Sequence, residues 1–86
     1  SEVSNALFSY RSAREKAVQR ERQIASLEKS VEYTEQLITH GTTTYLEVLT
    51  AQQSLLNARL SGVNDEFQQI QAVVDLYRAL GGGRTE

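Results

Sequence analysis

Mostly apolar residues recur at alternating spacings of three and four along two long stretches of this chain, with Arg20, Thr34 and Gln53 as the polar members of the two series. A repeat of 3.5 residues is typical of helices that pack side by side in coiled coils. The first series is Val3, Ala6, Tyr10, Ala13, Ala17, Arg20, Ile24, Leu27, Val31, Thr34 and Ile38. The second series is Leu46, Leu49, Gln53, Leu56, Leu60, Val63, Phe67, Ile70, Val74 and Tyr77. The pattern predicts an all-α fold with helices at about 2–40 and 44–80.

The stretch from Thr39 to Thr44 is the one clear interruption between these series. Gly41 can take the left-handed conformation that ends a helix. Thr44 followed three residues later by Glu47 matches the capping box that begins one, with Thr43 as an alternative N-cap. The sequence therefore predicts a turn at about 41–43 that is too short for anything but antiparallel packing. The whole chain is then a single two-helix coiled-coil hairpin with a Gly-rich tail at 81–86.

Folding the chain about Gly41 and Thr42 brings the two series opposite one another. Small residues of the first helix then meet large residues of the second, as Ala17 meets Phe67, and close packing requires such matching. Ile24 is expected to contact Leu60. The predicted helix-packing seam comprises Ala17, Ile24, Leu27, Leu56, Leu60 and Phe67.

A second apolar stripe on the second helix has no partner in this hairpin. It consists of Val48, Ala51, Leu55, Ala58, Gly62, Val73, Leu76 and Leu80. A helix that is apolar on two sides needs neighbours on two sides, and two helices alone enclose a small core. The hairpin is expected to pack with further helices, in an oligomer or in a parent protein. The isolated chain is expected to self-associate, in part through Ala51, Leu55 and Ala58.

The composition of the chain argues against several classes of function. Nine Lys and Arg against eleven Asp and Glu leave a net charge of −2, which argues against nucleic-acid binding. Cysteine is absent and there is one histidine, so we expect no metal site, no cofactor and no catalytic residue. No apolar run reaches the length of a membrane-spanning helix. The sequence has no initiator methionine or signal peptide, and we expect a fragment of a larger protein.

Two polar residues flank the turn. His40 is expected to be a polar residue near the carbonyl groups that end the first helix. Glu47 has two interpretations that can coexist. It can cap the second helix, or it can act as a functional acid, with a ring of copies lining an opening at the end of the hairpin.

The second helix contains two linked motifs. Residues 41–55 read Gly-Thr-Thr-Thr-Tyr-Leu-Glu-Val-Leu-Thr-Ala-Gln-Gln-Ser-Leu, and residues 76–83 read Leu-Tyr-Arg-Ala-Leu-Gly-Gly-Gly. Together they resemble the C-terminal region of TolC-type outer-membrane efflux proteins, especially the lipoprotein branch that works with resistance–nodulation–division pumps. The first helix resembles that family only as a generic long helix.

The resemblance implies a function. Members of the family are trimers that continue an outer-membrane β-barrel with a periplasmic α-helical barrel, for export of small molecules from Gram-negative bacteria. This chain would be the periplasmic hairpin of the second repeat. Its turn would meet a periplasmic adaptor protein, which joins the channel to an inner-membrane pump. The implied contact residues are Gly41, Thr42, Thr43 and Thr44, and Glu47 would line the aperture.

The chain also departs from the family pattern. Some members carry a second acid where this chain has Thr50, an arginine where it has Thr43, and an aromatic residue where it has Ile38. An ionic latch made of those groups is not expected here. The alternative interpretation is a generic antiparallel coiled coil that serves as an oligomerisation or scaffold module. A membrane-surface helix is disfavoured, because the polar face mixes both charges.

Overall fold

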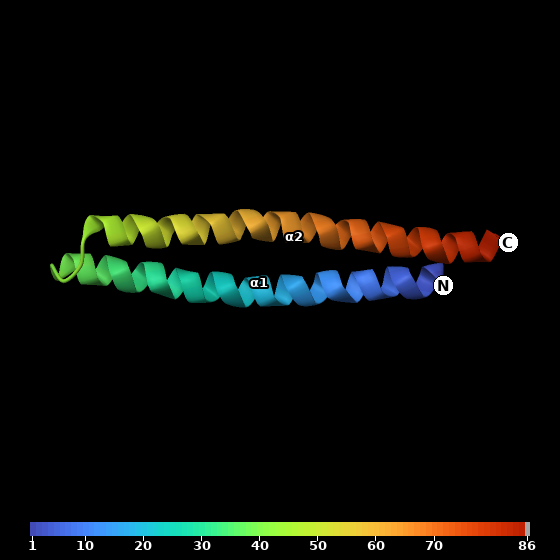
Figure 1. Ribbon diagram of the computed structural model, residues 1–86, viewed down its shortest axis with the longest axis horizontal. Helices are drawn as coiled ribbons and strands as arrows, with labels where there is room; N and C mark the ends of the chain where they lie inside the picture. Colours follow the sequence, from blue (N-terminus) through green and yellow to red (C-terminus); the bar gives the residue numbers. More distant parts are fainter. Residues whose placement is uncertain (86) are drawn as a thin grey trace. The chain divides into compact units, whose positions relative to one another are not determined.

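The structure is a computed structural model that describes residues 1–85, and the side chains of residues 1–81. It consists of α1, Glu2–Thr39, and α2, Tyr45–Thr85 (Figure 1). This confirms the all-α helical hairpin. Helix α2 continues through Gly81–Gly83, where the sequence predicted a tail. A glycine costs a helix only about 1 kcal/mol, and adding a residue to an existing helix is far easier than starting one.

The chain divides into two compact units. Unit 1 combines Ser1–Gln19 with the part of α2 that begins at Val63, and unit 2 is Arg20–Gly62. In each unit a segment of α1 packs antiparallel to a segment of α2 (Figure 1). The predicted antiparallel pairing is therefore correct within each unit.

The face that α1 turns towards α2 is the predicted one. All members of its apolar series are half-buried, including Ala17 in unit 1 and Ile24 and Leu27 in unit 2. Their neighbours along the helix are mostly exposed. The 3.5-residue repeat of α1 thus identified its inner face in both units.

The predicted seam on α2 is wrong. Leu56 and Leu60 in unit 2 are 56% and 61% exposed, and Phe67 in unit 1 is 68% exposed. The residues of α2 that face α1 repeat with the same 3.5-residue period, shifted by two positions. They are Val48, Ala51, Leu55, Ala58 and Gly62 in unit 2, and Asp65, Gln69, Ala72, Leu76 and Ala79 in unit 1. Most of the stripe that the sequence analysis assigned to outside partners is the inner seam.

The contact between Ile24 and Gly62 gives the physical reason. A Cβ atom added to Gly62 would lie 3.4 Å from Cδ1 of Ile24 and 3.6 Å from Cγ of Arg20. Ile24 therefore packs over a glycine and not against Leu60. Small residues on α2 accept the larger side chains of α1 at short range. Large and small residues do match in unit 2. The large residue, Ile24, lies on α1 and the small one, Gly62, on α2, whereas the sequence predicted small residues on the first helix and large ones on the second.

Candidate functional site

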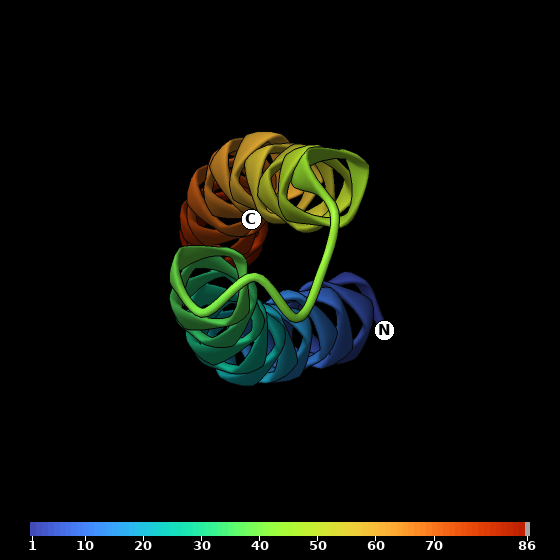
Figure 2. The ribbon, with the colours of Figure 1, turned by 90° about the vertical axis from the view of Figure 1, so that its left-hand side faces the viewer.

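The turn that joins α1 to α2 lies in unit 2 (Figure 2). Gly41 has a φ of 71°, the left-handed conformation expected from the sequence. The amide of Thr42 donates to the carbonyl of Leu37 at 2.9 Å, and that of Gly41 to the carbonyl of Ile38 at 3.0 Å. This pair of hydrogen bonds is the Schellman motif, which satisfies the last carbonyls of a helix.

Two side chains reinforce this end of α1. The hydroxyl of Thr42 donates to the carbonyl of Leu37 at 3.1 Å. Nδ1 of His40 lies 2.8 Å from the carbonyl oxygen of Gln36, and since a carbonyl can only accept, this nitrogen carries the proton. His40 therefore hydrogen-bonds to a carbonyl group at the end of α1, where the sequence predicted a polar residue near these carbonyls. The role of Thr42 was missed, because no spacing rule singles out a threonine just past a helix.

The start of α2 matches half of the predicted capping box. Helix α2 begins at Tyr45, which makes Thr44 its N-cap, and the amide of Glu47 donates to Oγ1 of Thr44 at 3.4 Å. The carboxylate of Glu47 accepts a hydrogen bond from the hydroxyl of Thr43, whereas a full capping box would use the N-cap amide. Thr43 is thus a partner of Glu47, and Thr44 is the cap.

The turn presents an open polar surface. Gly41, Thr42, Thr44 and Glu47 are exposed, and Thr43 is half-buried. A Cβ atom added to Gly41 would meet nothing within 4 Å. The glycine is therefore needed for its backbone conformation, while the space around it remains free for another molecule. The carboxylate of Glu47 stays accessible while it accepts from Thr43.

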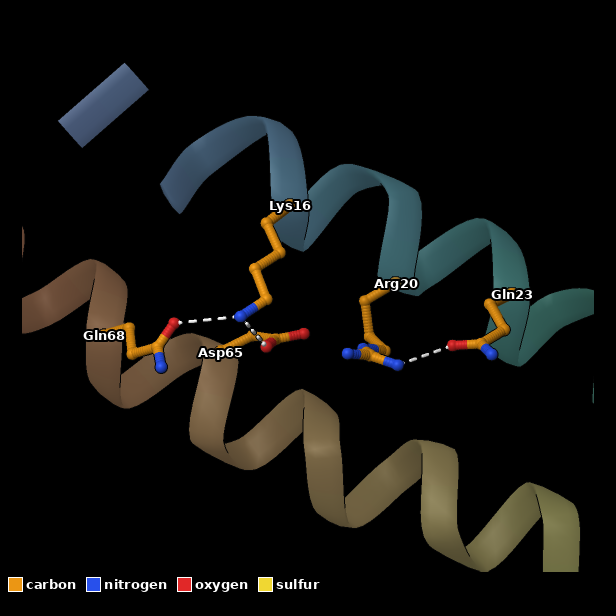
Figure 3. Close-up of polar contacts among 5 residues, drawn as sticks. All are labelled: Lys16, Arg20, Gln23, Asp65 and Gln68. Atoms are coloured by element: carbon orange, nitrogen blue, oxygen red, sulfur yellow. Dashed lines mark hydrogen bonds and ion pairs between the residues drawn. The ribbon is translucent and has the colours of Figure 1, made fainter. Parts of the chain in front are cut away.

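Unit 1 contains an ion pair with a buried carboxylate that the sequence analysis did not identify. Asp65 is 3% exposed, and its Oδ1 lies 3.5 Å from Nζ of Lys16. The same Nζ donates to Oε1 of Gln68 at 3.2 Å (Figure 3). The signal lies in a seven-residue repeat in which every member except Asp65 is alanine. This repeat is Ala51, Ala58, Asp65, Ala72 and Ala79.

The described residues were also compared with the requirements of a metal site and of a membrane-spanning helix. No group of three or more His, Asp or Glu side chains there could hold a metal ion. Over the same residues, neither helix combines the length and hydropathy that crossing a membrane requires.

Comparison with known proteins identifies relatives over most of the chain. The family model for the outer membrane efflux protein matches residues 1–82. The cation efflux system protein CusC of Escherichia coli (strain K12) is 34% identical over 82 residues, which are 95% of this chain and 18% of CusC. The solvent efflux pump outer membrane protein SrpC of Pseudomonas putida is 46% identical over 43 residues, 50% of this chain and 9% of SrpC.

A third relative is the toluene efflux pump outer membrane protein TtgI, also of Pseudomonas putida. It is likewise 46% identical over 43 residues, 50% of this chain and 9% of TtgI. The chain spans about a fifth of the length of CusC and less of the other two. No solved structure matches the chain.

Proposed function

The chain belongs to the outer membrane efflux protein family, and on that premise we propose that it forms part of the periplasmic wall of an efflux channel that exports small molecules. Its expected role is structural, with no catalysed reaction. The relatives are named for efflux of cations, solvents and toluene, so the family membership supports transport and leaves the exported compound open.

The observation that carries this proposal is the exposed apolar stripe of α2. In unit 2 it consists of Leu46, Leu49, Leu56 and Leu60, and in unit 1 of Val63, Phe67, Ile70, Val74 and Tyr77. The opposite side of α2 already packs on α1 in each unit. Exposed apolar surface of this extent marks a site of association. A helix in the wall of a helical barrel has neighbours on both sides. The two faces of α2, one packed on α1 and one apolar and exposed, fit such a position.

The partners follow from the same proposal. We expect a homotrimer of the parent protein, in which the exposed stripe of α2 packs on a neighbouring hairpin. The isolated chain should self-associate through this stripe, and not through Ala51, Leu55 and Ala58, which face α1 in unit 2. An adaptor protein and an inner-membrane pump complete the proposed assembly.

The turn is the proposed docking surface for the adaptor. Its short connection and the free space around Gly41 support this role, because a partner can approach Gly41, Thr42, Thr43 and Thr44 closely. The carboxylate of Glu47 accepts a hydrogen bond from the hydroxyl of Thr43 at the start of α2, and the residue is exposed. In a trimer, copies of Glu47 would place negative charge around the opening of the channel.

The test separates assembly from docking in the full-length protein. Leu60→Asp puts a charge into the exposed stripe and should abolish the trimer. Asn57→Asp introduces the same side chain one turn earlier on another face, and the trimer should persist. Gly41→Trp should leave the trimer intact but abolish crosslinking to the adaptor and efflux. Native gel electrophoresis, crosslinking and export assays provide the readouts.

Two results would contradict the proposal. A trimer that tolerates Leu60→Asp as well as Asn57→Asp would show that the stripe is not a wall contact. Normal crosslinking and efflux in Gly41→Trp would remove the turn from the docking surface, and would favour a generic coiled-coil scaffold.

A further inference from the structure

A surface groove lies between α1 and α2 within unit 1. Its volume is about 500 Å³, which is within the range of about 300–1,000 Å³ that small-molecule pockets have. Ala13 of α1 and Ala72 of α2 line the groove and leave it open, because their side chains fill little of the space between the helices. Phe8 and Phe67 also line it, and these rings are 73% and 68% exposed.

Charged residues line this groove at two levels. Nζ of Lys16 lies 3.5 Å from Oδ1 of Asp65 and donates to Oε1 of Gln68 at 3.2 Å (Figure 3). Its positive charge is therefore balanced by a buried carboxylate. Asp75 is exposed, and its Oδ1 accepts a hydrogen bond from Nε2 of Gln71 at 3.1 Å. Over the described residues, Asp75 makes this hydrogen bond and no ion pair.

The ring of Phe8 lies at the same end of the groove as Asp75. Lys16 meets Gln68 across the two helices, and in an antiparallel pair a step back along α1 corresponds to a step forward along α2. Phe8 precedes Lys16 by about two turns, and Asp75 follows Gln68 by about two turns. Because both residues line the groove, an aromatic ring and a carboxylate border the same space.

The charges around this end leave it negative. A second groove of about 260 Å³ adjoins the first at Asp75, and it is also lined by Glu2 and Arg78. Glu2 and Arg78 carry opposite charges that offset each other, as do those of the Lys16 ion pair. Asp75 therefore adds one negative charge that no other group lining the two grooves offsets. Charge complementarity favours a ligand with a single positive charge.

We propose that this end of the groove binds an organic monocation, an ammonium or guanidinium group on an apolar body. The cation pairs with the carboxylate of Asp75 and lies against the ring of Phe8, and the apolar body extends along Ala13 and Ala72. Phe67 belongs to the exposed stripe that we assign to a neighbouring hairpin, so the site does not require it. This site goes beyond the proposed function and does not depend on it.

The ring and the carboxylate select for charge in different ways. The face of an aromatic ring attracts a cation within about 6 Å of its centre, and guanidinium and quaternary ammonium groups are common partners. The carboxylate attracts any cation and repels anions, and salt weakens this attraction because Asp75 is exposed. A neutral molecule of the same shape gains only from contact with the apolar surface, so it should bind more weakly.

Binding can be measured on the purified full-length protein by saturation-transfer difference NMR. Benzyltrimethylammonium is the probe, and benzyl alcohol is the neutral comparison. Asp75→Asn removes the charge but keeps an oxygen that can accept from Gln71, and Phe8→Leu keeps an apolar side chain without the ring. Each should weaken binding of the cation by about two- to fivefold, and added salt should weaken it in the unaltered protein.

The matched control is Glu66→Gln, which removes another exposed carboxylate of α2 that does not line the groove. It should bind the cation as the unaltered protein does, and any uptake of the probe by detergent is common to all variants. No binding of the cation, equal binding of benzyl alcohol, or equal losses in Asp75→Asn and Glu66→Gln would overturn the site.

A different occupant would give a different result. If Asp75→Asn dissociates the trimer, the groove is a contact between hairpins and the monocation site is wrong. The proposed function survives each of these failures, because it is tested separately by the Leu60→Asp and Gly41→Trp variants.

Discussion

The two units have the same heptad spacing at their inner faces but differ in the residues that occupy it. In unit 2 the inner face of α1 contains Ile24, Leu27 and Val31, that of α2 contains Gly62 and Leu55 among others, and a turn joins the two helices. In unit 1, Ala6, Ala13 and Ala17 of α1 meet a seam on α2 that includes Asp65 and Gln69. Unit 2 therefore has an apolar seam with an exposed ion pair, between Arg59 and Glu28, at its edge, whereas the seam of unit 1 consists largely of small residues and contains a buried carboxylate.

This contrast indicates where each unit obtains its stability. Large side chains over small ones bury apolar area within unit 2 itself. The small side chains on the inner face of α1 in unit 1, such as Ala13 and Ala17, offer less apolar area for burial, and the large residues Phe8 and Phe67 are exposed at the edge of a surface groove. We expect unit 1 to depend more strongly on neighbouring helices in the assembled channel.

The largest expected effect concerns the seam of unit 2. Gly62→Leu should lower the free energy of unfolding by about 1–3 kcal/mol, because the new side chain has no room beside Ile24. Gly62→Ala should raise it by up to about 1 kcal/mol, since alanine favours helix and a Cβ atom there is at van der Waals distance. Thermal unfolding of the chain followed by circular dichroism provides the measurement. Equal effects of both variants would show that α1 does not approach Gly62 closely.

The second prediction compares the ion pairs of the two units. Lys16→Met removes a partner of the buried Asp65 and should cost about 1–2 kcal/mol, less than for a fully buried pair, because Lys16 is half exposed. Arg59→Met breaks the Glu28 pair, whose two side chains are both more than half exposed, and should cost at most about 0.5 kcal/mol. Urea unfolding of both variants checks the ranking, and the opposite order would reject the buried pair.

The smallest expected effect concerns the turn that only unit 2 has among the described residues. Glu47→Gln keeps an acceptor for the hydroxyl of Thr43 but removes the charge at the start of α2. It should cost about 0.3–1 kcal/mol, the usual contribution of one charge near a helix N-terminus. Glu47→Ala should cost more, because it also removes the acceptor. If glutamine and alanine are equally destabilising in unfolding experiments, the bond from Thr43 contributes nothing.

Much of the architecture could be read from local patterns. The spacing of apolar residues located both helices and the inner face of α1, and the glycine and threonine signals located the turn, with Gly41 in the left-handed conformation and Thr44 as the N-cap. These features depend on residues close together in the chain. The motifs at 41–55 and 76–83 also pointed to the family that the comparison then identified over residues 1–82.

The inner face of α2 was decided only by tertiary structure. The helix carries two apolar stripes with the same period, so periodicity alone cannot choose between them. The stripe with the larger side chains was the natural prediction for the seam, yet Leu60 and Phe67 are exposed and Ala58 is buried. The choice depends on how closely the backbone of α2 can approach residues such as Ile24, and small side chains allow the closer approach. The sequence determined the helices, the turn and the existence of two contact faces, whereas packing between helices determined which face α1 occupies and which remains for a neighbour.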